Sequence, residues 1–377
     1  MDLLRIGIIG AGAVARSVHL PGLRLCPQVE IAAGCDSDLA AARTLGTPRV
    51  FERVEDLLAT GDVDAVVVAT PNHLHPEIAG AALEAGKHVL CEKPLALNLS
   101  DARGMARAAE ASGLVHMTAF TYRFTPALQY LRRLVDAGEL GTLRTVRAAY
   151  LMATSKHLLG WRSTRRLAGS GVLADIGSHL IHMVQFLAGD ILALTASRRR
   201  FREDPESDVE DWISFLAEFT GGACGTFEIS RVCAGRGAGI SEDVFIELYG
   251  TAGSAVFSLQ DPWALRVALG PEAEDPSCPL VRREVPANFL KIAGSTRDVH
   301  ADDPRWGYRY DQAWQFVESI RQGKPKAPTF ADGARCQAVL DAALESSETR
   351  SWVQVGQDHI LQADSQSAFL GHEQEAD

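Results

Sequence analysis

The pattern of hydrophobic positions in the first third of the chain predicts buried strands that alternate with helices. Five short runs dominated by aliphatic residues are typical of strands covered on both faces; they occupy residues 4–9, 30–35, 65–69, 88–91 and 115–119. Alanine-rich segments of helical composition lie between them, at residues 38–45, 76–85 and 99–111. Strands joined by helices form βαβ units, so we predict an N-terminal Rossmann domain over residues 1–121, with a doubly wound parallel sheet.

The pattern changes after Tyr122. Helices are expected at residues 125–137, 173–187, 308–321 and 332–347. The other apolar segments follow one another with few helices between them, at residues 145–150, 192–197, 212–219, 224–230, 244–249, 255–257 and 265–268. Successive strands without crossover helices form antiparallel sheets. We therefore predict a C-terminal α/β domain over residues 122–356, with a large, open, mostly antiparallel sheet, and a polar tail at residues 357–377.

Composition narrows the class of protein. A chain of 377 residues is too long for one ordinary core, which favours two domains. The net charge of −11 argues against a partner that is recognised through nucleic-acid phosphates. The seven cysteines show no C-x-x-C pairing, so we expect neither a disulfide framework nor a zinc ribbon, and we expect a cytoplasmic protein. No apolar run reaches the roughly 18 residues that a membrane helix needs.

A glycine-rich turn, Gly10-x-Gly12-x-x-Ala15, lies between the first predicted strand and the first helix. Gly10 permits a tight turn, Gly12 lets the backbone approach a pyrophosphate, and Ala15 allows close packing of helix on sheet. Ala13 and Val14 complete the turn, where the helix N-terminus offers free N–H groups to phosphates. The segment therefore predicts a dinucleotide cradle.

Asp36 ends the second predicted strand, where a carboxylate can accept hydrogen bonds from the ribose hydroxyls of adenosine. Asp38 follows, and no arginine is adjacent in sequence. Two acids at this position would repel a 2′-phosphate, so we predict NAD, with NADP less favoured. Asp38 could instead cap the following helix.

Two further loops follow strands of the predicted parallel sheet. Since ligands bind beyond the carboxyl ends of such strands, we expect cofactor contacts from both loops. The first loop contributes Thr70, Pro71, Asn72 and His75, and the second contributes Glu92 and Lys93. A lysine in a crevice can polarise a carbonyl oxygen or stabilise a developing alkoxide, which makes Lys93 a catalytic candidate as well.

Asp175 and His179 are four residues apart on a predicted helix and so share one of its faces. We expect Asp175 to orient the imidazole and raise its pKa, and His179 to exchange the substrate proton. Three nearby glycines would let a ligand approach closely: Gly169, Gly171 and Gly177. A metal held by His179, His182 and Asp175 is the alternative, and we expect no metal.

Together these segments resemble the glucose–fructose oxidoreductase and inositol dehydrogenase family, Gfo/Idh/MocA, over residues 5–355. The resemblance rests on the motifs Gly-Ile-Ile-Gly-Ala-Gly at 7–12, Ala-Thr-Pro-Asn-His-x-His at 69–75, Glu-Lys-Pro at 92–94, Tyr-Arg-Phe-x-Pro at 122–126, Gly-Ser-Gly-Val-Leu-x-Asp-x-Gly-x-His at 169–179 and Asp-Gly at 332–333. Two positions depart from the family pattern: Ser170 stands where a glycine is common, and His182 where an aspartate is common.

The resemblance implies that Lys93, Asp175 and His179 form the catalytic set. It also implies that the open sheet of the second domain mediates a homo-oligomer, a dimer or tetramer. The expected activity is NAD-dependent hydride transfer between nicotinamide and a secondary hydroxyl or keto carbon of a sugar, inositol or sugar derivative. Candidate substrate contacts, beside Asp175 and His179, are Tyr122, Arg123, His157, Trp161 and Arg162, followed by Trp306 and Tyr308.

Two other functions would use the same residues. One is redox-assisted glycoside cleavage or epimerisation, in which bound NAD is recycled within each turnover. The other is a non-catalytic regulator that binds a dinucleotide and a partner protein. Retention of Lys93, Asp175 and His179 argues against the regulator.

Overall fold

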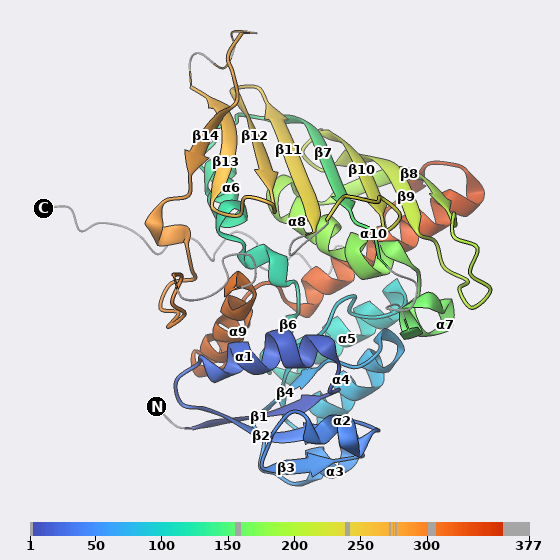
Figure 1. Ribbon diagram of the computed structural model, residues 1–377, viewed down its shortest axis with the longest axis vertical. Coiled ribbons are helices and arrows are strands. Elements are labelled where there is room, and N and C mark those ends of the chain that lie inside the picture. Colours follow the sequence, from blue (N-terminus) through green and yellow to red (C-terminus); the bar gives the residue numbers. More distant parts are fainter. Residues whose placement is uncertain are drawn as a thin grey trace, which may run out of the picture.

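Two β-sheets organise the chain in the computed structural model (Figure 1). The structure describes residues 3–154, 160–237, 242–270, 273, 275, 277–300 and 307–356. Two predicted substrate contacts, His157 and Trp306, lie outside the described residues, as does the expected tail at residues 357–377.

The first sheet has six strands in the order β3-β2-β1-β4-β5-β6. All of its described pairings are parallel, which confirms the doubly wound sheet. Its strands are β1 (Leu4–Ile9), β2 (Val29–Cys35), β3 (Arg49–Phe51), β4 (Ala65–Val68), β5 (His88–Cys91) and β6 (His116–Thr118). The edge strand β3 was not predicted, because it is short and only half-buried and so has no aliphatic pattern.

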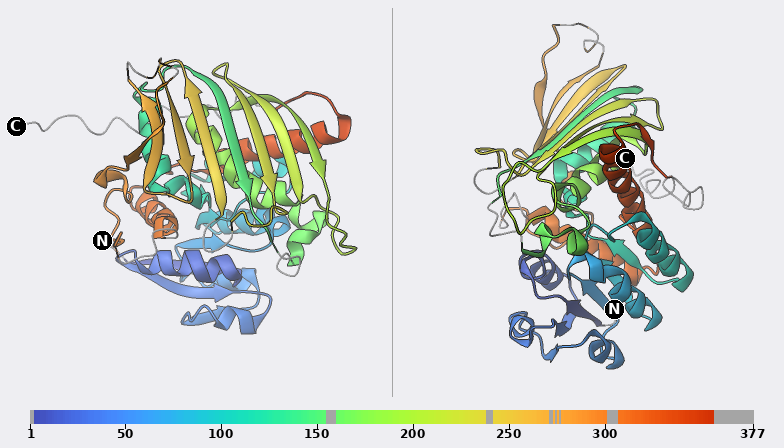
Figure 2. Two further views of the ribbon diagram at one scale, coloured as in Figure 1. Left: turned by 45° about the horizontal axis from the view of Figure 1, so that its top comes forward. Right: turned by 90° about the vertical axis from the view of Figure 1, so that its right-hand side faces the viewer.

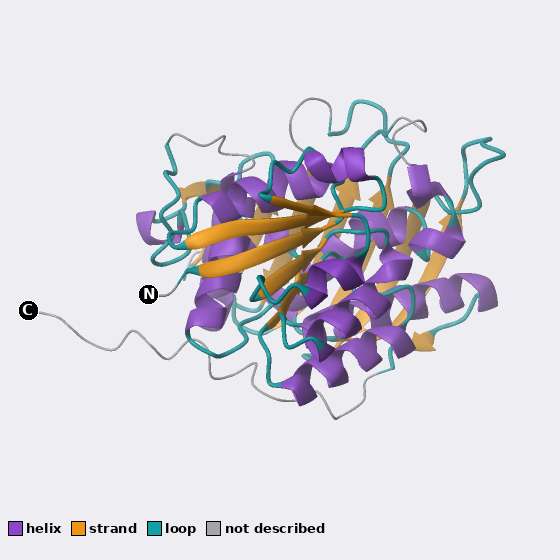
Figure 3. Ribbon diagram, turned by 90° about the horizontal axis from the view of Figure 1, so that it is seen from below, coloured by secondary structure: helices purple, strands orange, loops and turns teal. Residues whose placement is uncertain are grey.

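Helices flank both sides of this sheet (Figure 3). They are the π-helical turn η1 (Ala15–His19), α1 (Leu20–Arg24), α2 (Leu39–Arg43), α3 (Val54–Ala59), the 3-10 turn η2 (Asn72–Leu74), α4 (His75–Glu84) and α5 (Leu99–Ser112). A helix from the far end of the chain, α9 (Asp311–Arg321), also packs here. Its residues Phe316 and Val317 are fully buried in the same core as Leu23 of α1. The chain therefore returns to the first sheet after building the second.

The second sheet has nine strands in the order β14-β13-β12-β11-β7-β10-β9-β8-β15. Its described pairings are antiparallel except for β7 with β10, which confirms the mostly antiparallel sheet. Its strands are β7 (Leu143–Leu151), β8 (Ile191–Arg199), β9 (Trp212–Phe219), β10 (Cys224–Ser230), β11 (Asp243–Gly250), β12 (Gly253–Ser258), β13 (Ala264–Leu269), β14 (Val281–Glu284) and β15 (Val353–Gln354).

One face of this sheet is covered by helices and the other is open (Figure 2). The covering helices are α6 (Pro126–Asp136), α8 (Ser178–Ala188) and α10 (Phe330–Thr349). Along β9, Phe215 is buried against them, whereas Leu216 is half exposed on the open face. This alternation, one residue in and the next out, is what a sheet with one covered face requires.

Short turns connect these layers. They are η3 (Thr121–Phe124), η5 (Gly160–Ser163), α7 (Arg165–Ala168), η6 (Leu173–Gly177), η8 (Ala287–Phe289) and η9 (Gly307–Tyr310). The helix predicted at residues 173–187 thus begins as a π-helical turn, η6, and continues as α8. The stretch Arg165–Ala188 is long and apolar enough to cross a membrane, but 78% of its most apolar window is buried inside the protein, as expected for a core helix.

Candidate active site

A cavity of about 650 Å³ lies where the carboxyl ends of the parallel strands meet η6 and α8. Ligand sites commonly have about this volume, 300–1,000 Å³. Most residues proposed for cofactor contact line it: Gly10, Gly12, Ala13, Val14, Asp36, Thr70, Pro71, Asn72, Glu92 and Lys93. So do Tyr122, Trp161, Arg162, Asp175 and His179.

The glycine-rich turn has the geometry that its sequence requires. Gly10 has φ +94°, and a Cβ there would lie 2.5 Å from the carbonyl oxygen of Ala69, so only glycine fits. Apart from its own neighbours in the chain, no described residue has a heavy atom within 4 Å of a Cβ built on Gly12, which leaves its backbone accessible from the cavity. Ala15 is fully buried beneath the turn and does not line the cavity, in keeping with its packing role.

Asp36 is held firmly at the end of β2. One of its carboxylate oxygens accepts a hydrogen bond from the Ala11 amide (2.7 Å), and the other from the Asp38 amide (3.0 Å). Asp38 itself caps α2 by accepting from the Ala40 amide at 2.8 Å, so of these two aspartates it is Asp36 that lines the cavity. The fold also brings Arg16 to this turn, where its Nη1 donates to the carbonyl of Ala11 at 3.0 Å.

The loop after β4 divides its residues between cavity and core. Asn72 donates to the carbonyl of Ala168 (3.0 Å) and so ties the parallel sheet to α7. His75, by contrast, is fully buried between the carbonyls of Thr70 and Pro94, each 3.0 Å from a ring nitrogen. Burial lowers the pKa of His75. The structure therefore does not bring His75 to the cavity. His75 instead lies in the core and connects the loop after β4 to the loop after β5 through these two carbonyls.

Glu92 links the same loops to the first helix. Its Oε1 lies 2.8 Å from Nε2 of the buried His19, and its Oε2 accepts from the Lys93 amide at 3.2 Å. Burial alone would raise the pKa of the Glu92 carboxyl, but His19 and Lys93 hold it below its usual value. An ionised Glu92 therefore lies directly before Lys93.

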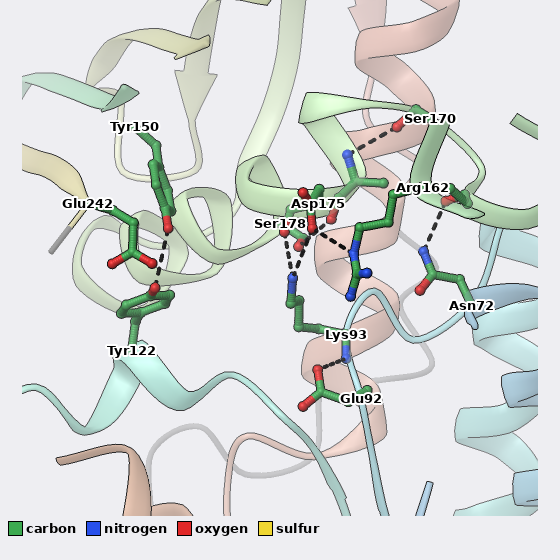
Figure 4. A network of polar contacts seen from close by, with 12 residues as sticks. Asn72, Glu92, Lys93, Tyr122, Tyr150, Arg162, Ser170, Asp175, Ser178 and Glu242 are labelled. Atoms are coloured by element: carbon green, nitrogen blue, oxygen red, sulfur yellow. Dashed lines mark hydrogen bonds and ion pairs between the residues drawn. The ribbon is translucent and has the colours of Figure 1, made fainter. Parts of the chain in front are cut away.

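Lys93 and Asp175 meet across the cavity (Figure 4). Lys93 Nζ donates to the Asp175 carbonyl at 2.5 Å and lies 3.9 Å from its carboxylate. Arg162 Nε lies 3.3 Å from the same carboxylate, and its guanidinium covers the Trp161 ring at 4.4 Å. Burial alone would raise the pKa of Asp175, but Lys93 and Arg162 hold it below its usual value. Burial lowers the pKa of Lys93, and Asp175 opposes that shift.

His179 is buried, and its Nδ1 has no hydrogen-bond partner among the described residues. Its ring stands edge-on to Tyr122, with centroids 4.5 Å apart. Burial lowers the pKa of His179 well below its usual value, and Lys93, Arg309 and His182 lower it further. The expectation that Asp175 would raise this pKa was wrong. Burial, followed by these neighbours, keeps the imidazole neutral near pH 7, and the carboxylate of Asp175 pairs with Lys93 and Arg162.

A buried glutamate, which the sequence did not single out, holds the turn that carries Asp175. Glu210 Oε1 accepts from the amides of Gly171 (2.8 Å) and Leu173 (3.1 Å). A Cβ on Gly171 would lie 2.0 Å from the Glu210 carbonyl oxygen, so this glycine is required by backbone packing and not by approach of a ligand. Ser170, the departure from the family pattern, accepts from the Ala174 amide at 3.0 Å and braces the same turn.

Among the polar residues that line the cavity, the sequence did not single out Tyr150, Glu242 and Arg309. They come from β7, from the residue before β11, and from η9, so only the folded chain brings them together. Tyr150 ends the strand predicted at 145–150, Arg309 lies in the first turn of the helix predicted at 308–321, and Glu242 comes two residues before the strand predicted at 244–249. These positions are the signal that could have marked them.

Two proposed substrate contacts lie away from the cavity. Arg123 covers the ring of Phe186 at 4.0 Å, and burial lowers its pKa to about 10. Tyr308 is buried in the core of the second sheet. His182 stacks on Phe120, with ring centroids 3.9 Å apart, and does not line the cavity. Within the described residues, no group of three His, Cys, Asp or Glu side chains could hold a metal ion.

Known proteins match the chain over almost its whole length. Residues 4–120 match the model of the oxidoreductase family with an NAD-binding Rossmann fold, and residues 128–256 match the Gfo/Idh/MocA C-terminal domain. Levoglucosan dehydrogenase of Pseudarthrobacter phenanthrenivorans is 32% identical, over 95% of this chain and 99% of that protein. Glucose-6-phosphate 3-dehydrogenase of Bacillus subtilis is 27% identical, over 90% and 95%.

Solved structures of similar proteins also match the chain over almost its whole length. An oxidoreductase domain protein from Kribbella flavida superposes with a TM-score of 0.84 at 34% identity, covering 95% of this chain and 100% of that one. Levoglucosan dehydrogenase in complex with NADH gives a TM-score of 0.85 at 31% identity, covering 94% and 100%. The fold, the glycine-rich turn and these matches lead to one conclusion: the chain belongs to the Gfo/Idh/MocA family of NAD-binding oxidoreductases.

Proposed function

We propose that this protein is an NAD-dependent oxidoreductase that transfers hydride between nicotinamide and a secondary hydroxyl or keto carbon of a sugar, inositol or sugar derivative. One observation carries the proposal: a single cavity contains both the dinucleotide cradle and the group of Lys93, Asp175 and His179. The relatives named as sugar dehydrogenases support the substrate class.

The cavity suits NAD on its own features. The open backbone at Gly12, the carboxylate of Asp36 and the hydroxyl of Thr70, which has no hydrogen-bond partner among the described residues, lie along its wall. The amides of Ala13 and Val14 would hold the pyrophosphate and Asp36 the adenosine ribose, with Pro71, Asn72 and Glu92 along the remainder. Bound NAD would supply the hydride acceptor.

The protein's own residues would handle the oxygen and its proton. When a hydroxyl carbon is oxidised, its O–H proton would pass to His179, which is neutral and therefore able to accept it. The ammonium of Lys93 would stabilise the negative charge that develops on the oxygen, and Asp175 holds that ammonium in place. Burial raises the pKa of Tyr122 well above its usual value, which makes it a hydrogen-bond donor and not a base.

The remaining assignments follow from this proposal. Residues 1–121 would form the dinucleotide-binding unit, and residues 122–356 the substrate-binding and oligomerisation unit, with Tyr122, Trp161 and Arg162 contacting substrate.

The seven cysteines are free, which fits the cytoplasm. No described element covers the outer face of the second sheet (Figure 2), so we propose a homo-oligomer, a dimer or tetramer, through this face. A mass in solution of a single 40.6-kDa chain would contradict the oligomer.

A screen of NAD reduction with sugars, glycosides and inositols tests the proposal. For any active substrate, Lys93→Met should lower kcat by about 10²–10³, the usual cost of losing one donor to a developing oxyanion. NAD binding should be nearly unchanged. Lys87→Met is the matched control, because Lys87 precedes β5 and Lys93 follows it. A near-native kcat for Lys93→Met would make Lys93 structural. Product formation without net NADH would favour recycling of bound NAD.

Cofactor preference depends on Asp36. We predict a higher kcat/KM with NAD than with NADP, because the fixed Asp36 carboxylate would repel a 2′-phosphate. Asp36→Ala should narrow the difference in kcat/KM between NAD and NADP, since Arg16 lies at the same turn and could then pair with the 2′-phosphate. Asp38→Ala should cost about 1 kcal/mol of stability as a lost cap, without changing the preference. A preference of the wild type for NADP would contradict the prediction.

The pH profile tests the proton path. The rate should fall on the acid side only as pH drops through the pKa of His179, which lies well below the usual histidine value. It should fall on the alkaline side as Lys93 loses its charge. Asp175 raises the pKa of Lys93, so Asp175→Asn should move the alkaline limb to lower pH. An alkaline limb that does not move in Asp175→Asn would remove Lys93 from this role.

A further inference from the structure

The end of the cavity on the side of the second sheet is built by four residues that the mechanism above does not use together. Tyr122 comes from η3, Tyr150 from β7, Glu242 from the residue before β11 and Arg309 from η9. We call them the distal cluster. In Figure 4 its labelled members, Tyr122, Tyr150 and Glu242, lie across Lys93 from Asn72.

The distal cluster is closely connected. The hydroxyls of Tyr122 and Tyr150 lie 3.2 Å apart. Arg309 donates to the Tyr122 hydroxyl, lies over its ring at 4.6 Å, and forms an ion pair with Glu242 at 3.5 Å. The side chains of Arg309 and Glu242 are only 11% and 22% exposed. The cluster therefore presents a fixed, largely desolvated polar wall.

The distal cluster adjoins the reacting end of the cavity through Tyr122. The Tyr122 ring that Arg309 covers is the same ring that stands 4.5 Å from His179. A substrate whose hydroxyl meets Lys93 and His179 would therefore place its further hydroxyls against this wall.

The charges of the two ends differ. At the reacting end, Lys93 and Arg162 both face the carboxylate of Asp175, and the Lys93 ammonium is the cation available to a developing oxyanion. At the distal end, the charge of Arg309 is balanced by Glu242, and burial keeps both tyrosines neutral by raising their pKa well above the usual value. A phosphate or carboxylate of the substrate would meet the Glu242 carboxylate in a partly buried site, where like charges are costly.

Neutral hydroxyls fit this wall better. A carboxylate accepts hydrogen bonds from two neighbouring hydroxyls, a guanidinium donates to their oxygens, and phenols do both. Relatives are named for neutral levoglucosan and for glucose 6-phosphate, so membership of the family does not decide the charge of the substrate.

We propose that the distal cluster recognises an uncharged vicinal diol, and that the substrate is a neutral sugar or cyclitol without a phosphate or carboxylate at that end. This inference rests on the proposed function and narrows its substrate class. Glu242 is then the specificity-determining residue, since it both binds the diol and repels an anion.

The test compares matched neutral and anionic sugars. For wild-type protein with NAD, kcat/KM is measured with methyl glucoside and myo-inositol, and with glucose 6-phosphate and glucuronate. We expect the better neutral sugar to exceed the better anionic one at least about tenfold. Glu242→Gln should lower kcat/KM for the neutral sugar about ten- to hundredfold, mainly through KM, because a charge-assisted hydrogen bond is lost. The same variant should also lower the ratio of kcat/KM for the neutral sugar to kcat/KM for the anionic sugar.

Glu247→Gln is the control, because Glu247 lies on β11 but pairs with Arg147 at 2.7 Å outside the cavity. It should leave the ratio unchanged. A wild-type preference for the phosphorylated or carboxylated sugar would overturn this inference and leave the proposed function intact. An unchanged ratio in a folded Glu242→Gln would also overturn it. No NADH from any sugar would contradict the proposed function itself. If Glu242→Gln does not fold, the preference of the wild-type protein for neutral over anionic sugars, measured as kcat/KM, still tests the inference.

Discussion

The contact between Lys93 and Asp175 is the interaction on which the site depends. Lys93 follows β5 of the parallel sheet, and Asp175 belongs to η6, which packs on the second sheet. The contact therefore joins the dinucleotide side of the cavity to the helix that carries His179. Charges removed from water are costly unless they are paired, and Asp175 has both Lys93 and Arg162 as partners. Removal of Asp175 would leave two cations without their shared counter-ion.

The supporting structure serves this contact from both sides. On the sheet side, Glu92 accepts from the Lys93 amide and is fixed by His19, and His75 joins the adjacent loops. On the helix side, Glu210 and Ser170 hold the turn that carries Asp175. The same arrangement separates the charge states of the site. Asp175 raises the pKa of Lys93 and so favours its charged form. Burial and the neighbouring cations lower the pKa of His179, which stays neutral.

Much of the cavity wall could be predicted from the sequence, because ligands bind beyond the carboxyl ends of parallel strands. That rule applied to Gly10, Asp36 and Lys93, each of which lies one or two residues after a strand. The rule could not tell which way a loop side chain points, so His75 was assigned to the cavity although it lies in the core. Arg123, proposed as a substrate contact after the family resemblance, instead covers the ring of Phe186.

Of the distal cluster, only Tyr122 was singled out in the sequence. That Tyr150, Glu242 and Arg309 converge on it could not be predicted, since their meeting depends on the register of the second sheet and on the return of the chain through η9. The relation of Asp175 to His179 was also missed. The prediction from their four-residue spacing assumed a regular α-helix, whereas Asp175 lies in the π-helical turn η6. It also left out Lys93 and Arg162, the two cations that Asp175 meets only in the folded protein.

The most direct measurement is the isotope content of the cofactor after a single turnover. Protein in excess is mixed with NAD and a sugar substrate that is deuterated at its ring carbons, the reaction is stopped by denaturation, and the recovered cofactor is analysed by mass spectrometry. Direct hydride transfer predicts reduced cofactor that carries deuterium from the sugar. Cofactor recovered unreduced, or reduced without deuterium while product forms, would contradict the account.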